Sequence, residues 1–131
     1  MKNNSYIKNK FLNKFLTKTP IGYTFSARAE TSSMEPTICT GEYIWVRRTP
    51  FKQVHIHDMI MFKRPNTPHP VVHRVVNFGS NKLGPYLITK GDNLQTNDSY
   101  RIRKKDFIGT VYLEKSIVKK ISFFLRRFAS I

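Results

Sequence analysis

Three short stretches of this chain carry residue types that together perform nucleophilic hydrolysis: residues 33–36, 72–76 and 89–93. The first contains Ser33, the second His73, and the third an acidic residue. A serine hydroxyl is a weak nucleophile until a neighbouring base takes its proton, and an imidazole does so best when a carboxylate orients it. The combination favours proteolysis, but the chain order serine, histidine, aspartate differs from the commoner triad orders and decides nothing by itself.

The residues around Ser33 resemble the serine box of type I signal peptidases. In that box a serine before methionine lies just ahead of a glycine, an acidic residue and a strand. Here Ser33 precedes Met34, and residues 41–46 supply the glycine, the glutamate and an apolar run. Residues 57–62 resemble the next family strand, usually written Gly-Asp-Ile-Ile-Val-Phe, with His57 in place of the glycine.

The histidine at position 73 indicates the branch of this family. Bacterial housekeeping members typically carry a lysine base at this place, whereas the endoplasmic-reticulum, archaeal and sporulating-bacterial type carries histidine. Residues 90–93 with Asp98 resemble that branch's Gly-Asp-Asn-Asn box and the aspartate that follows it. Residues 108–111 resemble the closing Gly-x-Val strand. The resemblance extends over residues 29–113, and its five boxes occur in the family order.

The resemblance implies a role for each of these polar residues. Ser33 would attack the scissile carbonyl, and His73 would accept its proton and pass it to the leaving amine. Family spacing implies that Asp98 orients His73. Asp92 is the second choice for this acid, because an acid in its box can instead brace the backbone around the site. Asp58 is interpreted as structural, capping or orienting its strand.

The developing oxyanion needs hydrogen-bond donors, and two are expected near the nucleophile. The backbone N–H of Ser33 is the first. In relatives the residue two positions before the nucleophile is a hydroxyl residue placed as the second donor, and Thr31 occupies that position here. Ser32 stands where many relatives have glycine, which is a departure from the family pattern.

Other residues offer alternative chemistry that the sequence favours less. Lys90 is an alternative base for a Ser–Lys dyad, as in the related LexA-type peptidases. His55 and His57 lie two apart, hence on one face of a strand, but no further cysteine or acid at ligand spacing supports zinc. The resemblance implies neither a metal nor an organic cofactor. The single cysteine, Cys39, excludes an internal disulfide and is interpreted as structural.

The middle of the chain contains short runs rich in β-branched and aromatic residues, separated by turn signals with Pro, Gly and Asn. Such a pattern predicts a mainly β fold, a compact antiparallel domain, and the resemblance implies the signal-peptidase/LexA-like type. The expected strands are residues 43–46, 58–62, 71–76, 86–89 and 107–112, and the expected turns are residues 49–50, 64–66, 68–70, 79–81 and 84–85.

Both ends of the chain predict a short amphipathic helix, over residues 5–18 and 115–131, with apolar residues on one face and mostly lysine or arginine on the other. The chain therefore divides into three parts. Residues 1–28 form a basic N-terminal segment with an amphipathic helix, residues 29–113 a peptidase-like β catalytic domain, and residues 114–131 a basic amphipathic C-terminal helix.

The formal net charge of +15 belongs mostly to these ends. Family members are normally anchored by an apolar helix before the serine box, but no run here reaches the roughly 18–20 apolar residues that cross a bilayer. The basic ends are therefore expected to hold the protein peripherally on an anionic membrane surface. A membrane-anchored partner subunit is a further means of attachment. The alternative is that both helices bury their apolar faces against the β domain.

The expected function is that of a serine endopeptidase of the histidine-type signal peptidase branch. Its substrates would be the signal peptides of secretory or membrane preproteins, cut after small residues one and three positions before the scissile bond. The positive charge also fits a small nucleic-acid-binding protein, but it lies at the termini and no base-reading motif is present. A catalytically inactive, peptidase-like interaction subunit is the third interpretation.

Overall fold

The computed structural model describes residues 20–113, which form one six-stranded antiparallel sheet. The two helices expected at the ends lie outside the described residues, and the division into three parts stays a prediction. The strands occur in the spatial order β1-β2-β6-β3-β4-β5. They are β1 (Thr24–Arg28), β2 (Tyr43–Arg47), β3 (Met59–Phe62), β4 (Val71–Asn81), β5 (Gly84–Lys90) and β6 (Phe107–Leu113), with a short 3-10 helix, η1, at Phe51–Gln53.

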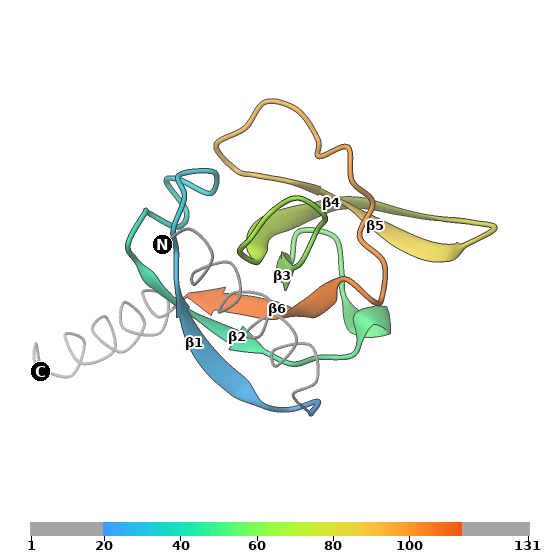
Figure 1. The fold of residues 1–131 in the computed structure, drawn as a ribbon, viewed down its shortest axis with the longest axis horizontal. Helices are drawn as coiled ribbons and strands as arrows, with labels where there is room; N and C mark the ends of the chain where they lie inside the picture. Colours follow the sequence, from blue (N-terminus) through green and yellow to red (C-terminus); the bar gives the residue numbers. More distant parts are fainter. Residues whose placement is uncertain (1–19, 114–131) are drawn as a thin grey trace, which may run out of the picture.

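Every strand pairs antiparallel with its neighbours, so the expected antiparallel β domain is confirmed. The last strand, β6, lies between β2 and β3 and joins the first half of the sheet to the second. The β4–β5 hairpin, green to yellow in Figure 1, projects beyond the other strands. Within residues 20–113 no helix is long and apolar enough to span a membrane.

The alternation of side chains along β2 shows why this segment forms a strand. Ile44 and Val46 are buried, whereas Tyr43, Trp45 and Arg47 between and beside them are exposed. Successive residues of a strand point to opposite faces, so one face of β2 packs into the core and the other meets solvent. The central position of β6 gives a different pattern, in which five consecutive residues from its start are buried.

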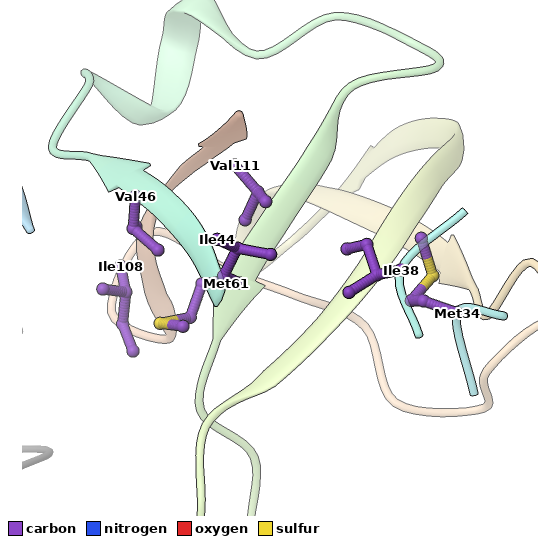
Figure 2. Packing of buried hydrophobic residues seen from close by; sticks show 7 residues of the cluster. All are labelled: Met34, Ile38, Ile44, Val46, Met61, Ile108 and Val111. Carbon is purple, nitrogen blue, oxygen red and sulfur yellow. The ribbon is translucent and has the colours of Figure 1, made fainter. Parts of the chain in front are cut away.

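The core consists of two clusters on opposite faces of the sheet. Ile60 belongs to one cluster and its neighbour Met61 to the other, as the two-residue period of a strand requires. The first cluster contains Met34, Ile38, Ile44, Val46, Met61, Ile108 and Val111, all drawn in Figure 2. The second contains Ile60, Phe62, Val75, Leu87, Ile102 and Phe107.

Two of the expected turns are wrong, because residues 79–81 and 84–85 belong to the long β4–β5 hairpin. The turn itself is at residues 82–83. Gly79 leaves room for Tyr86 across the hairpin, because a Cβ there would lie 2.5 Å from the Tyr86 hydroxyl oxygen. Gly84 follows the turn with φ +102, a conformation that glycine adopts readily. Both glycines therefore belong to the paired strands of the hairpin, although in the sequence they are typical of turns.

The edge strand β1 was not among the expected strands. Its five residues, Thr24–Arg28, pair with β2 in register, from Thr24 with Arg47 to Arg28 with Tyr43. Only Phe25 and Ala27 pack against the core, and both are partly buried. A strand with two partly buried apolar residues has only a weak alternating pattern in the sequence. Its pairing with β2 stabilises it as a strand.

Candidate active site

Ser33 lies in the serine loop, residues 29–42, which joins β1 to β2. Two apolar side chains fix this loop to the sheet. Met34, the residue after Ser33, is 3% exposed and Ile38 is 1% exposed. Figure 2 shows both in the buried cluster, where they enter from the loop and not from a strand. The Ile38 N–H donates to the Met34 carbonyl at 2.9 Å, so a single tight turn carries both anchors. The backbone next to Ser33 is thereby anchored to the core.

The Gly91-Asp92-Asn93 box holds the serine loop from its other side. The Asn93 N–H donates to the Ser33 carbonyl at 2.9 Å, and the Asn93 side-chain amide donates to the Ser32 carbonyl at 3.0 Å. A Cβ at position 91 would lie 2.6 Å from the Ser33 carbonyl oxygen, closer than real Cβ atoms come. Glycine at position 91 therefore lets the two backbones approach closely enough to form these bonds.

His73 projects from β4, with its imidazole directed at the serine. The side chain is almost fully buried, and its Nε2 lies 3.1 Å from Ser33 Oγ. The Phe62 ring meets the imidazole edge-on at a centroid distance of 6.1 Å, which restricts the ring's orientation. The sheet register pairs His73 with Ile60 of β3, so the base is held by a central part of the sheet. The structure thus brings the expected nucleophile and the expected base into hydrogen-bonding contact.

Asp98 contacts the other side of the imidazole, from the loop after β5. Its Oδ2 is bonded to His73 Nδ1 and also accepts a hydrogen bond from Thr89 Oγ1 at 2.8 Å. Burial favours the neutral carboxyl, but the hydrogen bonds from His73 and Thr89 outweigh it, so the pKa of Asp98 is lowered. An ionised carboxylate can only accept hydrogen bonds, so the neutral imidazole of His73 carries its proton on Nδ1. Its Nε2 is then free to accept a hydrogen bond from the Ser33 hydroxyl.

The two expected oxyanion donors also lie at the nucleophile. Thr31 Oγ1 is 3.2 Å from Ser33 Oγ, so the hydroxyl of Thr31 is close to the position of the reacting atom. Within residues 20–113 the backbone N–H of Ser33 donates to no acceptor. Both groups are hydrogen-bond donors of the kind that stabilises a developing oxyanion, and their role as such stays a prediction.

Asp92, the second choice for the triad acid, is directed away from the imidazole. Its two oxygens accept hydrogen bonds from Arg74 Nε at 2.9 Å and from Arg74 Nη2 at 2.8 Å. Thr37 Oγ1 donates to the same carboxylate at 2.6 Å. The hydrogen bonds from Arg74 are the main reason why the pKa of Asp92 is lowered, with Thr37 and the charge of Lys90 adding to it against the effect of burial. Asp98, not Asp92, is the carboxylate on His73.

The other candidate residues take structural positions. Asp58 Oδ2 accepts a hydrogen bond from the His55 N–H at 2.9 Å and so caps the turn before β3, in line with its expected structural role. His55 and His57 lie in that turn, so the expectation that they share a strand face is wrong. The described residues contain no group of three or more His, Cys, Asp or Glu placed to hold a metal ion. Lys90, the alternative base, donates from Nζ to the Gly91 carbonyl at 3.2 Å. The nitrogen that contacts Ser33 Oγ is Nε2 of His73.

Three residues around the site were not singled out from the sequence. Thr89 supports Asp98, while Thr37 and Arg74 hold Asp92. Arg74 follows His73 directly, and its place in the same box is a signal that could have found it. Thr37 contacts a residue 55 positions away, and no local pattern marks such a pair.

Comparison with known proteins relates this region to one family. Residues 15–112 match the family described as "Signal peptidase, peptidase S26". The signal peptidase complex catalytic subunit SEC11 of Komagataella phaffii is 36% identical over 100 residues, which cover 63% of this chain and 57% of that protein. The protein of the same name from Eremothecium gossypii is 38% identical over 96 residues, 63% of this chain and 56% of the relative.

This chain spans little more than half the length of these relatives. The matched region nevertheless contains all the residues that meet around Ser33, from the serine loop to the loop after β5. The family match also extends over the greater part of the chain. On this ground the chain belongs to the signal peptidase family, peptidase S26.

Proposed function

We propose that this protein is a serine endopeptidase that removes signal peptides from secretory or membrane preproteins. The observation that carries the proposal is the continuous hydrogen-bonded path from Ser33 Oγ through His73 to Asp98. The similar SEC11 proteins are named as catalytic subunits of signal peptidase complexes, which supports the substrate class.

The path supports a mechanism in which His73 serves as both base and acid. As Ser33 Oγ attacks the scissile carbonyl carbon, its proton passes to His73 Nε2, and Asp98 stabilises the imidazolium that forms. The imidazolium then protonates the leaving amine, the peptide bond breaks, and an acyl-enzyme ester remains on Ser33. Water, deprotonated by the same nitrogen, hydrolyses the ester. The Ser33 N–H and the Thr31 hydroxyl donate to the oxyanion in both tetrahedral intermediates.

The reaction takes place at a membrane in this proposal. The basic ends attract an anionic lipid surface, and a membrane-anchored partner subunit adds a second attachment, as the word "complex" in the names of the relatives suggests. Flotation of the full chain with liposomes of phosphatidylcholine alone or with phosphatidylserine tests the first part. The chain is expected to bind only the liposomes that contain phosphatidylserine, and to lose this binding at high salt. Absence of binding at low salt would contradict it.

Cleavage of a preprotein in detergent micelles by wild type and three variants tests the catalytic assignment. Ser33→Ala and His73→Ala each remove a reacting group, and Asp98→Asn removes the orienting carboxylate. Each change should lower kcat by roughly 10³-fold or more, with an unchanged thermal unfolding midpoint as the check on folding. Cleavage that persists in Ser33→Ala would exclude the serine mechanism. Loss in Ser33→Ala alone, with full activity in His73→Ala, would exclude His73 as the base.

A further inference from the structure

A second hydrogen-bonded network lies beside the Ser33–His73–Asp98 path and does not touch its reacting atoms. The Asp92 carboxylate is its centre, with Thr37 on one side and Arg74 on the other. The Asp92 side chain is 18% exposed and that of Arg74 is 28% exposed, so water only partly screens the pair. We call these residues the Asp92 brace, and the proposed mechanism gives them no chemical step.

The brace connects the two segments that carry the nucleophile and the base. Thr37 is in the serine loop, four residues after Ser33, and Arg74 is the neighbour of His73 on β4. Arg74 Nη1 also donates to the His57 carbonyl at 2.8 Å, which fixes β4 to the turn before β3. One carboxylate thus joins the loop of Ser33 to the strand of His73, two segments that are 40 residues apart at the Ser33–His73 contact.

Directional bonds are needed here because apolar packing alone does not define a distance between two polar atoms. Met34 and Ile38 hold the serine loop by burial, which is non-directional. A charge-assisted, two-point Arg–carboxylate pair fixes orientation as well as distance, and the 2.6 Å bond from Thr37 transmits that orientation to the loop. A displacement of about 1 Å between reacting groups can lower a rate roughly 10²-fold.

We propose that Thr37 and Arg74, acting through Asp92, are positioning residues that set the separation of Ser33 Oγ and His73 Nε2. The inference deepens the proposed serine endopeptidase function and rests on it. It assigns Asp92 a role distinct from that of Asp98, even though both carboxylates belong to the same loop region. It also gives Thr37, whose hydroxyl faces no reacting atom, an effect on the rate of the chemical step.

Three threonine variants of the full chain test the proposal on cleavage of a preprotein in detergent micelles. Thr37→Val removes the hydroxyl at nearly constant volume, and Thr37→Ser restores it. Thr49→Val is the matched control, because Thr49 Oγ1 bonds to Thr110 Oγ1 at 2.8 Å and not to the Asp92 carboxylate. Thr37→Val should lower kcat roughly tenfold with KM within about twofold, whereas Thr37→Ser and Thr49→Val should keep kcat within about twofold. Equal losses in Thr37→Val and Thr49→Val would overturn the proposal, as would an unchanged kcat in Thr37→Val.

The NMR signals of the His73 imidazole give a readout that needs no turnover. They are assigned with His73→Gln, because the chain has four histidines. Thr37→Val should shift the Nε2 signal as the bond to Ser33 lengthens, while Thr49→Val should leave it in place. If the wild type shows no Ser33-dependent cleavage, the proposed function fails, but this shift still decides whether the brace sets the contact. A His73 signal unmoved by Thr37→Val would overturn the inference by itself.

Discussion

Asp98 and Asp92 are hydrogen-bonded to adjacent residues of one strand, and the nature of those two partners differs. Asp98 is bonded to His73, and Asp92 is bonded to Arg74. Neighbouring residues of a strand point to opposite faces, so the two carboxylates reach β4 from different sides. An imidazole can give and take a proton near neutral pH, whereas a guanidinium always keeps its charge. In the proposed mechanism an aspartate therefore supports proton transfer at one face of β4, and a second aspartate fixes geometry at the other.

The largest expected effect separates the two aspartates directly. In Asp98→Asn the amide can donate to His73 Nδ1, which favours the tautomer with the proton on Nε2 and leaves no base facing Ser33. We expect kcat to fall by roughly 10⁴-fold with little change in KM, measured on a preprotein substrate under saturating conditions. If Asp92→Asn instead gave the larger loss and Asp98→Asn kept most of the activity, the roles of the two carboxylates would be reversed.

A substitution at Gly91 tests whether the box must approach the serine loop as closely as the structure shows. In Gly91→Ala the new Cβ would lie 2.6 Å from the Ser33 carbonyl oxygen, so the serine backbone must move. We expect kcat to fall by roughly 10²-fold. Gly79→Ala is the matched control, since its Cβ would meet the Tyr86 hydroxyl at 2.5 Å in the distant hairpin. A similar fall in kcat for both variants would indicate a general loss of structure.

Loss of the charge at position 92 is expected to have a smaller effect on rate and a clear effect on stability. In Asp92→Asn the partly buried guanidinium of Arg74 loses an ionic partner, and Thr37 loses a charged acceptor. The free energy of unfolding should fall by about 1–3 kcal/mol, and kcat roughly tenfold. Urea unfolding and steady-state kinetics measure the two effects. An unchanged stability together with a 10⁴-fold loss of kcat would mean that Asp92 takes part in the chemistry.

The sequence predicts which polar residues meet at Ser33 better than it predicts the contacts that support them. Ser33 and His73 are predicted together because each lies within a short box of chain neighbours, and Asp98 is predicted from its spacing after the third box. Thr37 could not, because its partner is 55 residues away and a threonine in a loop has no distinctive pattern. Family spacing favours Asp98 over Asp92, and the contacts of the two carboxylates with His73 and Arg74 are visible only in the structure.

The strands, like the site residues, are predicted where the sequence has a clear local pattern and are not where it has none. The central strands β2, β3 and β6 carry dense apolar runs, and their positions agree with the expected ones to within a residue at each end. The edge strand β1 was missed because only Phe25 and Ala27 of its five residues pack inward. The pattern predicts turns in the outer part of the β4–β5 hairpin because Gly79 and Gly84 are typical turn residues. In the structure Gly79 lies in a strand against Tyr86, and Gly84 adopts a positive φ directly after the turn.

Acid titration gives the smallest effect and tests the Arg74 pair without disturbing the triad geometry. Hydrogen bonding from Arg74 lowers the pKa of Asp92 below its ordinary value of 3.8. The unfolded chain therefore binds more protons than the folded one in this range, and stability decreases as the pH falls. The contribution of Asp92 is complete above about pH 5 and is lost as the pH falls through the folded-state pKa. The difference in thermal midpoint between wild type and Asp92→Asn should accordingly be constant above that pH and shrink below it.

Asp98, whose pKa is also lowered, is present in both proteins, so the difference isolates Asp92. A difference that persisted unchanged at the lowest pH at which both proteins fold would show that the pair stabilises by shape and not by charge.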